Sequence, residues 1–142
     1  MSLKFRKVQR KVLSGVDAGK TKTYASAKAN GYCDLKKLCK LISARSAMSS
    51  ADVKAILDSL NWVMDVELQS GNIVQLGEFG NFRLSLSSEG TDKEEAFTAS
   101  NIRKAKIVFF PGASLRQTRD TMDYEQEKPY EKEKECNRTH LD

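Results

Sequence analysis

Two short runs that combine phenylalanine with glycine constrain the fold of this chain more than any other feature. The first is Phe79-Gly80-Asn81-Phe82, and the second is Phe109-Phe110-Pro111-Gly112-Ala113-Ser114-Leu115. Each run couples large apolar side chains to residues that permit or fix an unusual backbone. A polar segment lies between the runs and is flanked by two stretches of strand-like composition. The pattern predicts a long β-hairpin that projects from a compact body.

The charges of the chain are unevenly distributed. The 142 residues carry a net charge of +5, from 24 Lys and Arg against 19 Asp and Glu. Residues 1–47 hold 12 basic and 2 acidic side chains, and residues 101–119 hold 5 and none, whereas residues 48–100 hold 3 and 9. Two basic blocks around an acidic one favour a polyanion-binding face. The alternative is a charged surface that is only solvated.

Several classes of protein are disfavoured by what the sequence contains. Three cysteines without a Cys-x-x-Cys pair, and a single histidine at His140, argue against a metal site or a disulfide framework. Cys39 is expected to be a small core residue. Neither a bilayer-spanning apolar run nor a signal peptide is present, so we expect a cytoplasmic protein without membrane contact. The lack of a Ser-His-Asp set and of a glycine-rich phosphate loop predicts no enzyme activity, no cofactor and no small-molecule substrate.

The first half of the chain contains recognisable strands and helices. Residues 2–12 and 22–28 mix β-formers with cations around a turn, which predicts an N-terminal β-pair. Asp34 is a plausible N-cap for a helix that runs to about Arg45. Ser49 and Asp52 form the pattern of a capping box for a second, longer helix that ends before Gly71.

The second half is expected to be mostly β-structure. Residues 73–76 read as a short strand, and from Phe82 the chain alternates apolar and polar side chains. Residues 102–110 form a returning strand that stops at Pro111, and a final helix extends to about Met122. From Asp123 onward the chain is acidic and poor in apolar residues, which predicts disorder.

The two aromatic runs, set behind two amphipathic helices, resemble a known pair of motifs. Leu76-x-x-Phe79-Gly80-x-Phe82 and Phe109-x-Pro111-Gly112-x-x-Leu115 look like the two signature segments of the HU/IHF family of bacterial histone-like DNA-binding proteins. The chain is similar to a variant group common in Bacteroidetes, whose extra N-terminal β-segment ends in a Tyr-Ala step, here Tyr24-Ala25. The resemblance covers residues 33–119, or 1–120 with the variant group.

This resemblance implies an α+β fold and an intertwined homodimer. A helical base would carry a three-stranded β-sheet with an extended β-arm, and the arms would wrap DNA through the minor groove. The implied domains are an N-terminal β-extension (1–32), an HU-like domain (33–121) with its arm at about 85–101, and a disordered acidic tail (122–142). The shared dimer core would include Phe79, Phe82, Phe109, Leu60 and Met64, because aromatic side chains bury large areas.

The expected arm departs from the family pattern at its tip. The family's Arg-Asn-Pro-x-Thr-Gly motif, whose proline wedges between base pairs, is absent. The tip reads Glu89-Gly90-Thr91-Asp92-Lys93-Glu94-Glu95-Ala96-Phe97, with four carboxylates against one lysine. Carboxylates are repelled by phosphates, so this tip is not expected to enter a groove deeply. Phe97 has two readings, as a wedge or as a residue that packs against the partner. Glu78 also replaces the motif's first glycine, and Phe110 stands where a lysine often precedes the proline.

Phosphate contacts require cations, amides and hydroxyls at the surface of the sheet. Alternation places Lys104 and Lys106 on one face of the returning strand and Arg103 on the other. Arg116 and Arg119 lie three residues apart on the final helix and can share a face. The expected DNA-binding residues are Arg83, Ser85, Ser87, Lys93, Asn101, Arg103, Lys104, Lys106, Arg116, Arg119, Lys4, Arg6 and Lys7.

These observations predict an architectural protein that binds double-stranded DNA largely without sequence preference. It is expected to bend or compact the duplex as a homodimer associated with the nucleoid. The alternative is an HU-fold structural or protein-interaction module whose acidic arm tip weakens its grip on DNA. The basic strands and N-terminus favour the first reading, and the acidic tip favours the second.

Overall fold

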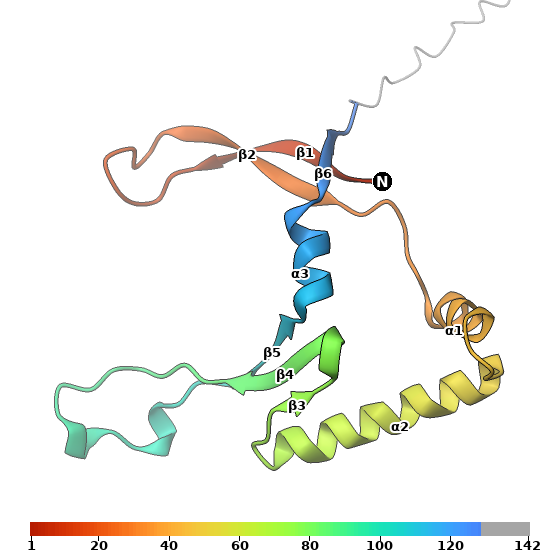
Figure 1. The fold of residues 1–142 in the computed structure, drawn as a ribbon. Helices are drawn as coiled ribbons and strands as arrows, with labels where there is room; N and C mark the ends of the chain where they lie inside the picture. Colours follow the sequence, from red (N-terminus) through yellow and green to blue (C-terminus); the bar gives the residue numbers. More distant parts are fainter. Residues whose placement is uncertain (129–142) are drawn as a thin grey trace, which may run out of the picture. The chain divides into compact units, whose positions relative to one another are not determined.

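The computed structural model describes residues 1–128 and divides the chain into two compact units. We call Met1–Gly31, together with residues 122–128, the terminal unit, and Tyr32–Thr121 the central unit. Figure 1 traces both units in sequence order. Among the described residues, no helix has the length and apolar character that a bilayer span requires.

The terminal unit is a three-stranded sheet with the order β2-β1-β6. Strands β1 (Ser2–Lys11) and β2 (Thr21–Lys28) are antiparallel, and β6 (Asp123–Gln126) lies parallel to the start of β1. The predicted N-terminal β-pair is therefore confirmed.

The prediction of disorder from Asp123 onward is wrong for the strand β6. This acidic segment is stabilised by a basic neighbour, since Glu125 is in register with Lys4, and Glu127 forms an ion pair with Lys28. The main-chain N–H of Glu127 also donates to the carbonyl of Phe5 at 2.8 Å. The remainder of the predicted tail, from residue 129, lies outside the described residues.

The helices of the central unit begin and end as their caps predict. Helix α1 spans Leu35–Ala44, and the Asp34 side chain accepts from the N–H of Lys37 at 2.8 Å. Helix α2 spans Ser50–Gln69 behind a complete capping box of Ser49 and Asp52. It ends before Gly71, whose φ of 78° is in the left-handed region that favours glycine.

The central sheet has the antiparallel order β3-β4-β5. Its strands are β3 (Val74–Gln75), β4 (Gly80–Ser85) and β5 (Lys106–Pro111), and the helix α3 (Ala113–Asp120) follows. The two aromatic runs meet here, because Phe82 pairs with Phe109 and Gly80 with Pro111. A Cβ at Gly112 would overlap the carbonyl oxygen of Glu78, so the close approach of the two runs requires glycine.

A segment that we call the central arm, residues 86–105, connects β4 to β5 (Figure 1). The sequence predicts a returning strand from residue 102, but the ladder stops at Ser85 and resumes only at Lys106. Between these points the arm contains one isolated bridge, from Ser88 to Ile102, and two short 3-10 turns. Its Ser, Gly, Asp and Thr residues favour turns over a continuous ladder.

The predicted aromatic anchors form one cluster but remain partly exposed. The ring centroids of Phe79, Phe82 and Phe109 lie 4.8 to 6.5 Å apart. Yet Phe79 is 52% exposed and Phe109 is 38% exposed. Within the described residues, the apolar side chains that are almost fully buried are those of Cys39, Val53 and Leu68, so Cys39 is a core residue as predicted.

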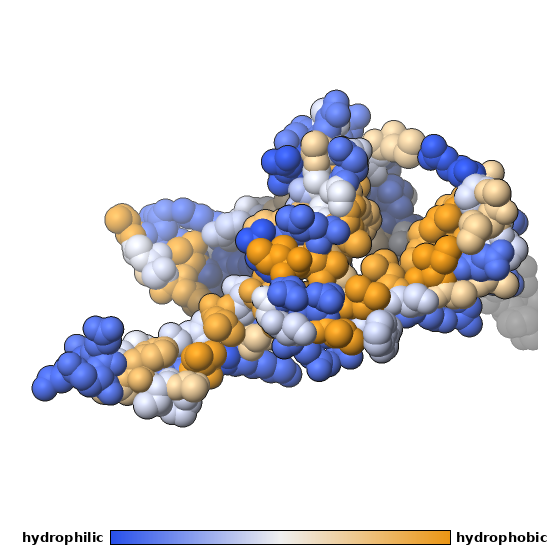
Figure 2. All heavy atoms as spheres, turned by 60° about the horizontal axis from the view of Figure 1, so that its bottom comes forward, coloured by the Kyte–Doolittle hydropathy of each residue, from blue (hydrophilic) through white to orange (hydrophobic). Residues whose placement is uncertain are grey.

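The apolar surface continues from this cluster onto α2. A hollow of about 580 Å³ lies between α2 and the inner face of the sheet, and its walls include Trp62, Met64 and Leu68 from the helix. Leu84 and Ile107 line it from the strands. Leu60 and Met64 are half-buried, and Trp62 and Ile107 are each 66% exposed. Figure 2 shows hydrophobic residues on the face of the molecule that is in view.

Candidate nucleic-acid interface

The outer face of the central sheet carries cations opposite the aromatic cluster. Paired residues in an antiparallel ladder point to the same side of the sheet. Ser85 pairs with Lys106, and Arg83 pairs with Val108, so Arg83, Ser85 and Lys106 share the face that the phenylalanine cluster does not use.

Arg83 is held in a defined orientation on this face. Its guanidinium lies over the ring of Phe110, 4.5 Å from the centroid, and its Nη2 donates to Asn81 Oδ1 at 3.1 Å. Its Nε is buried and has no hydrogen-bond partner among the described residues. Stacking and one hydrogen bond fix the plane of the guanidinium while leaving donors for another acceptor.

The structure brings Arg83 together with two arginines of α3. Arg83, Arg116 and Arg119 line one open hollow of about 550 Å³, which we call the arginine hollow. Gln75 and Asn81 add side-chain amides to its wall. These two residues were absent from the predicted set, although Asn81 stands two positions before Arg83 and so faces the same side of the strand.

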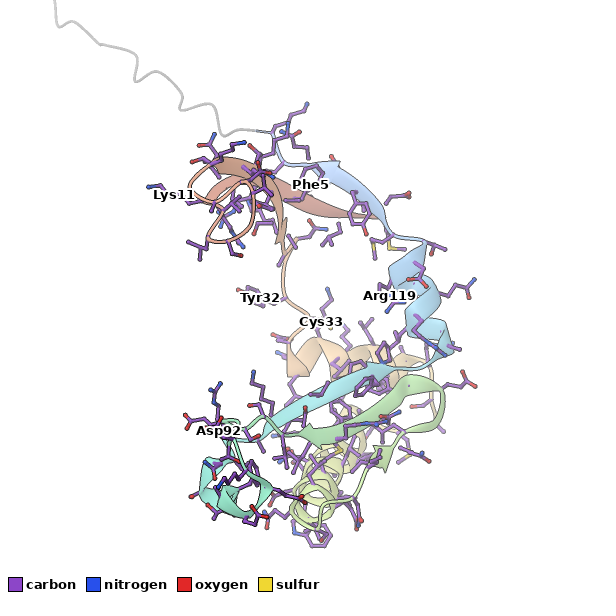
Figure 3. The ribbon with its side chains drawn as sticks, turned by 90° about the vertical axis from the view of Figure 1, so that its left-hand side faces the viewer. Phe5, Lys11, Tyr32, Cys33, Asp92 and Arg119 are labelled. Carbon is purple, nitrogen blue, oxygen red and sulfur yellow. The ribbon has the colours of Figure 1, made fainter. Side chains whose placement is uncertain are left out.

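Arg119, which lines the arginine hollow, is paired with a carboxylate. Arg119 Nε donates to Asp120 Oδ1 at 2.7 Å. This contact, aided by the nearby charge of Arg116, holds the pKa of the Asp120 carboxyl below its ordinary value. Asp120 therefore stays ionised near neutral pH and partly neutralises Arg119, and both side chains are exposed. Arg119 is labelled in Figure 3.

The predicted DNA-binding residues of the central arm do not line the arginine hollow. Asn101 caps the turn Ala99–Asn101, since its Oδ1 accepts from the N–H of Thr98 at 2.9 Å. The N–H of Arg103 donates to the carbonyl of Ser87 at 2.8 Å, and the side chains of Ser87, Lys93, Arg103 and Lys104 are exposed. Lys104 precedes β5, so it does not share a strand with Lys106.

The terminal unit carries a second group of cations. Register places Lys4, Arg6 and Arg10 on one face of β1, where Lys28 is opposite Lys4 and Lys22 is opposite Arg10. Lys7 points to the other face, so the predicted trio of Lys4, Arg6 and Lys7 is divided between two sides of the sheet.

The described residues contain no group of three or more His, Cys, Asp or Glu side chains that could hold a metal ion. In the central unit the candidate interface consists of cations, amides and hydroxyls on the sheet and on α3, and the terminal sheet carries cations of its own. Such groups are suited to hydrogen bonding with anionic oxygens.

Comparison with known proteins places these features in a family. The model of the HU-HIG family, described as an HU domain fused to a wHTH, Ig or glycine-rich motif, matches residues 1–126. A crystal structure from Bacteroides vulgatus, of a protein described as a candidate bacterial DNA-binding protein, has the same fold, with a TM-score of 0.57 and 15% sequence identity. The similarity covers 90% of this chain but 50% of that one. No curated protein matches the chain. Because the family model spans both units, the chain belongs to the HU-HIG family of HU domains.

Proposed function

We propose that the chain binds double-stranded DNA through its phosphate backbone, largely without sequence preference, and bends or compacts the duplex as a nucleoid-associated homodimer. The arginine hollow carries this proposal. Three arginines from β4 and α3 line one open depression, and guanidinium groups match the geometry of phosphate oxygens. The family and the description of the Bacteroides vulgatus protein support the same partner.

The residue types of the candidate interface favour contacts with the phosphate backbone of DNA over recognition of its bases. Lys106 and Ser85 extend the cationic face along the ladder from Arg83. Cations and hydroxyls on a sheet surface position a protein on DNA but carry no sequence information. The protein therefore acts through the shape and charge of the duplex, and no cofactor or catalytic step belongs to the proposal.

The exposure of the core supports the proposed homodimer. Phe79, Phe109, Leu84 and Ile107 are between 38% and 66% exposed in one chain. Side chains of this size stabilise a fold by about 1.5–3 kcal/mol each only when they are fully buried. A second copy that covers the hollow between α2 and the sheet would complete this core. Size-exclusion chromatography with light scattering should give twice the mass of 15.9 kDa.

The acidic central arm supports a second candidate function. Glu89, Asp92, Glu94 and Glu95 surround Lys93, and carboxylates repel phosphates. An HU-fold protein whose arm docks another protein, with weakened DNA binding, would carry such a tip. Figure 3 locates Asp92 on this arm.

Fluorescence anisotropy with a random-sequence duplex at two salt concentrations separates these functions. Wild-type protein should bind at low salt and lose affinity at higher salt, because each neutralised phosphate releases counterions. The double variant Arg83→Ala, Arg116→Ala should bind more weakly, with a salt slope reduced by about two. Lys36→Ala with Lys40→Ala on α1 is the matched control, since it removes the same charge away from the hollow. Equal slopes for both double variants would contradict the assignment of the hollow.

A further inference from the structure

The distal part of the β1–β2 hairpin is a two-stranded ribbon without a third strand. Strand β6 pairs only with Ser2–Phe5, whereas β1 and β2 remain paired as far as Lys11 and Thr21. We call residues 6–26 the basic hairpin. Its cations lie on both faces of the ribbon, with Arg6, Arg10 and Lys22 on one face and Lys7 and Lys11 on the other.

The tip of the basic hairpin has an ordered backbone. The N–H of Val12 donates to the carbonyl of Lys20 at 2.9 Å, and the N–H of Gly19 donates to the carbonyl of Val12 at 2.8 Å. Gly15 and Gly19 have φ values of 89° and 86°, which favour glycine, and let the chain turn tightly. A further bond, from the N–H of Ala18 to the carbonyl of Gly15 at 3.1 Å, closes the loop.

This ordered tip presents apolar side chains to solvent. Leu13 is 92% exposed and Val16 is 103% exposed. An isolated exposed apolar residue is common on proteins. Two such residues in one ordered loop, at the end of a cationic ribbon, are not explained by this common exposure and indicate a contact surface. In Figure 2 the end of the basic hairpin carries hydrophobic colour, whereas the end of the central arm is hydrophilic.

The single carboxylate of the basic hairpin is paired with lysines, so it adds little repulsion toward an anionic partner. Asp17 forms ion pairs with Lys20, at 2.8 Å, and with Lys22. These lysines hold the pKa of the Asp17 carboxyl below its ordinary value, so it is ionised and locally neutralised. The remaining cations, Arg6, Lys7, Arg10 and Lys11, form no ion pair among the described residues.

We propose that the basic hairpin is a second DNA-binding arm, whose tip residues Leu13 and Val16 enter the minor groove and insert between base pairs. This inference rests on the proposed function and specifies a further site for it. Minor-groove proteins insert apolar wedges in this way and kink the duplex. The tip of the central arm carries four carboxylates and its large apolar side chain, Phe97, is 42% exposed, whereas the hairpin tip combines two almost fully exposed apolar side chains with cations.

Charge on both faces of the ribbon favours DNA over an anionic membrane. A ribbon inside a groove meets phosphates along both walls, so cations on either face find partners. A membrane surface presents its charge from one side, and a ribbon lying on it would leave half of these cations unused.

Base unstacking tests the proposal directly. A set of duplexes, each with one 2-aminopurine, is titrated with the full chain while anisotropy reports binding. Wild-type protein should raise the 2-aminopurine fluorescence at one or more positions, because an inserted side chain unstacks the base. Leu13→Ser with Val16→Ser should abolish this rise and reduce bending, measured by energy transfer between end labels. Its affinity should fall by less than about tenfold, because the phosphate contacts remain.

The matched control is Tyr32→Ser, which removes another fully exposed apolar side chain, 93% exposed, outside the hairpin. It should leave both signals unchanged, and Leu13→Ile should retain them. Wild-type binding without any fluorescence rise would overturn the wedge while leaving DNA binding intact. Failure of the wild type to bind any duplex would overturn the proposed function and the wedge together. Leu13-dependent sedimentation with phosphatidylglycerol vesicles, without unstacking, would instead identify the tip as a lipid-inserting element.

Discussion

The basic hairpin and the central arm are both extensions between antiparallel strands, but they differ in charge, regularity and tip. The hairpin is a continuous ladder with six cations and one carboxylate, and the carboxylate is held by lysines. The central arm has a broken ladder, and its tip has four carboxylates and one lysine. Position in the fold therefore does not decide which extension can approach a phosphate polymer. The side chains at the tip and along the strands decide it.

The largest expected effect concerns the place where the two aromatic runs meet, at Gly112. Gly112→Ala should destabilise the protein by about 3 kcal/mol or more, because the new methyl group would overlap the carbonyl oxygen of Glu78. Gly90→Ala at the arm tip is the control, since nothing lies within 4 Å of its Cβ position. Urea denaturation followed by circular dichroism measures both. Equal stability of the two variants would show that the two aromatic runs do not meet as described.

Charge reversal in the basic hairpin should have the next largest effect. Arg6→Glu with Arg10→Glu should weaken duplex binding about a hundredfold at low salt, because two cations become anions on the groove-facing ribbon. Lys36→Glu with Lys40→Glu on α1 changes net charge equally and should cost much less. Anisotropy titration measures both affinities. If the α1 variant is as weak as the hairpin variant, net charge and not the hairpin governs binding.

Removing negative charge from the tip of the central arm tests the other extension. Glu94→Gln with Glu95→Gln should strengthen duplex binding by about threefold to tenfold at low salt, with little gain at high salt, since surface electrostatics is screened. The same titration checks this. Weaker binding by this variant would mean that the carboxylates contribute to the partner contact, as the protein-interaction function requires.

The smallest expected effect is the titration of the hairpin tip. Lys20 and Lys22 lower the pKa of Asp17. The ion pairs therefore stabilise the hairpin tip at pH values above the unfolded pKa of 3.8, and this stabilisation is lost as the pH falls through the folded pKa. Carboxyl chemical shifts in an NMR titration should therefore place the Asp17 midpoint below 3.8. A midpoint at or above that value would contradict the paired geometry of the tip.

Local signals in the sequence predicted much of the central unit. Asp34, Ser49 and Asp52 gave both helix starts, because a cap is a contact within a few residues. Alternation from Phe82 also gave the faces of β4, because its side chains follow a period of two.

Features that depend on distant residues were missed. Strand β6 exists through pairing of Glu125 with Lys4 across the whole chain, which no local pattern reveals. The arginine hollow unites Arg83 with Arg116 and Arg119 only after β4 and α3 are brought together. The returning strand was predicted to start at residue 102 because residues 102–110 are rich in β-formers, but the ladder starts only at Lys106, since turn-forming residues dominate the arm.

The salt dependence of binding tests the central claim most directly. The dissociation constant of the wild-type chain is measured by anisotropy for two duplexes of unrelated sequence over a series of salt concentrations. The account predicts steep, linear and superimposable plots of log affinity against log salt, because cations on both units displace counterions from phosphates. Absence of binding at low salt, or a flat dependence, would contradict it.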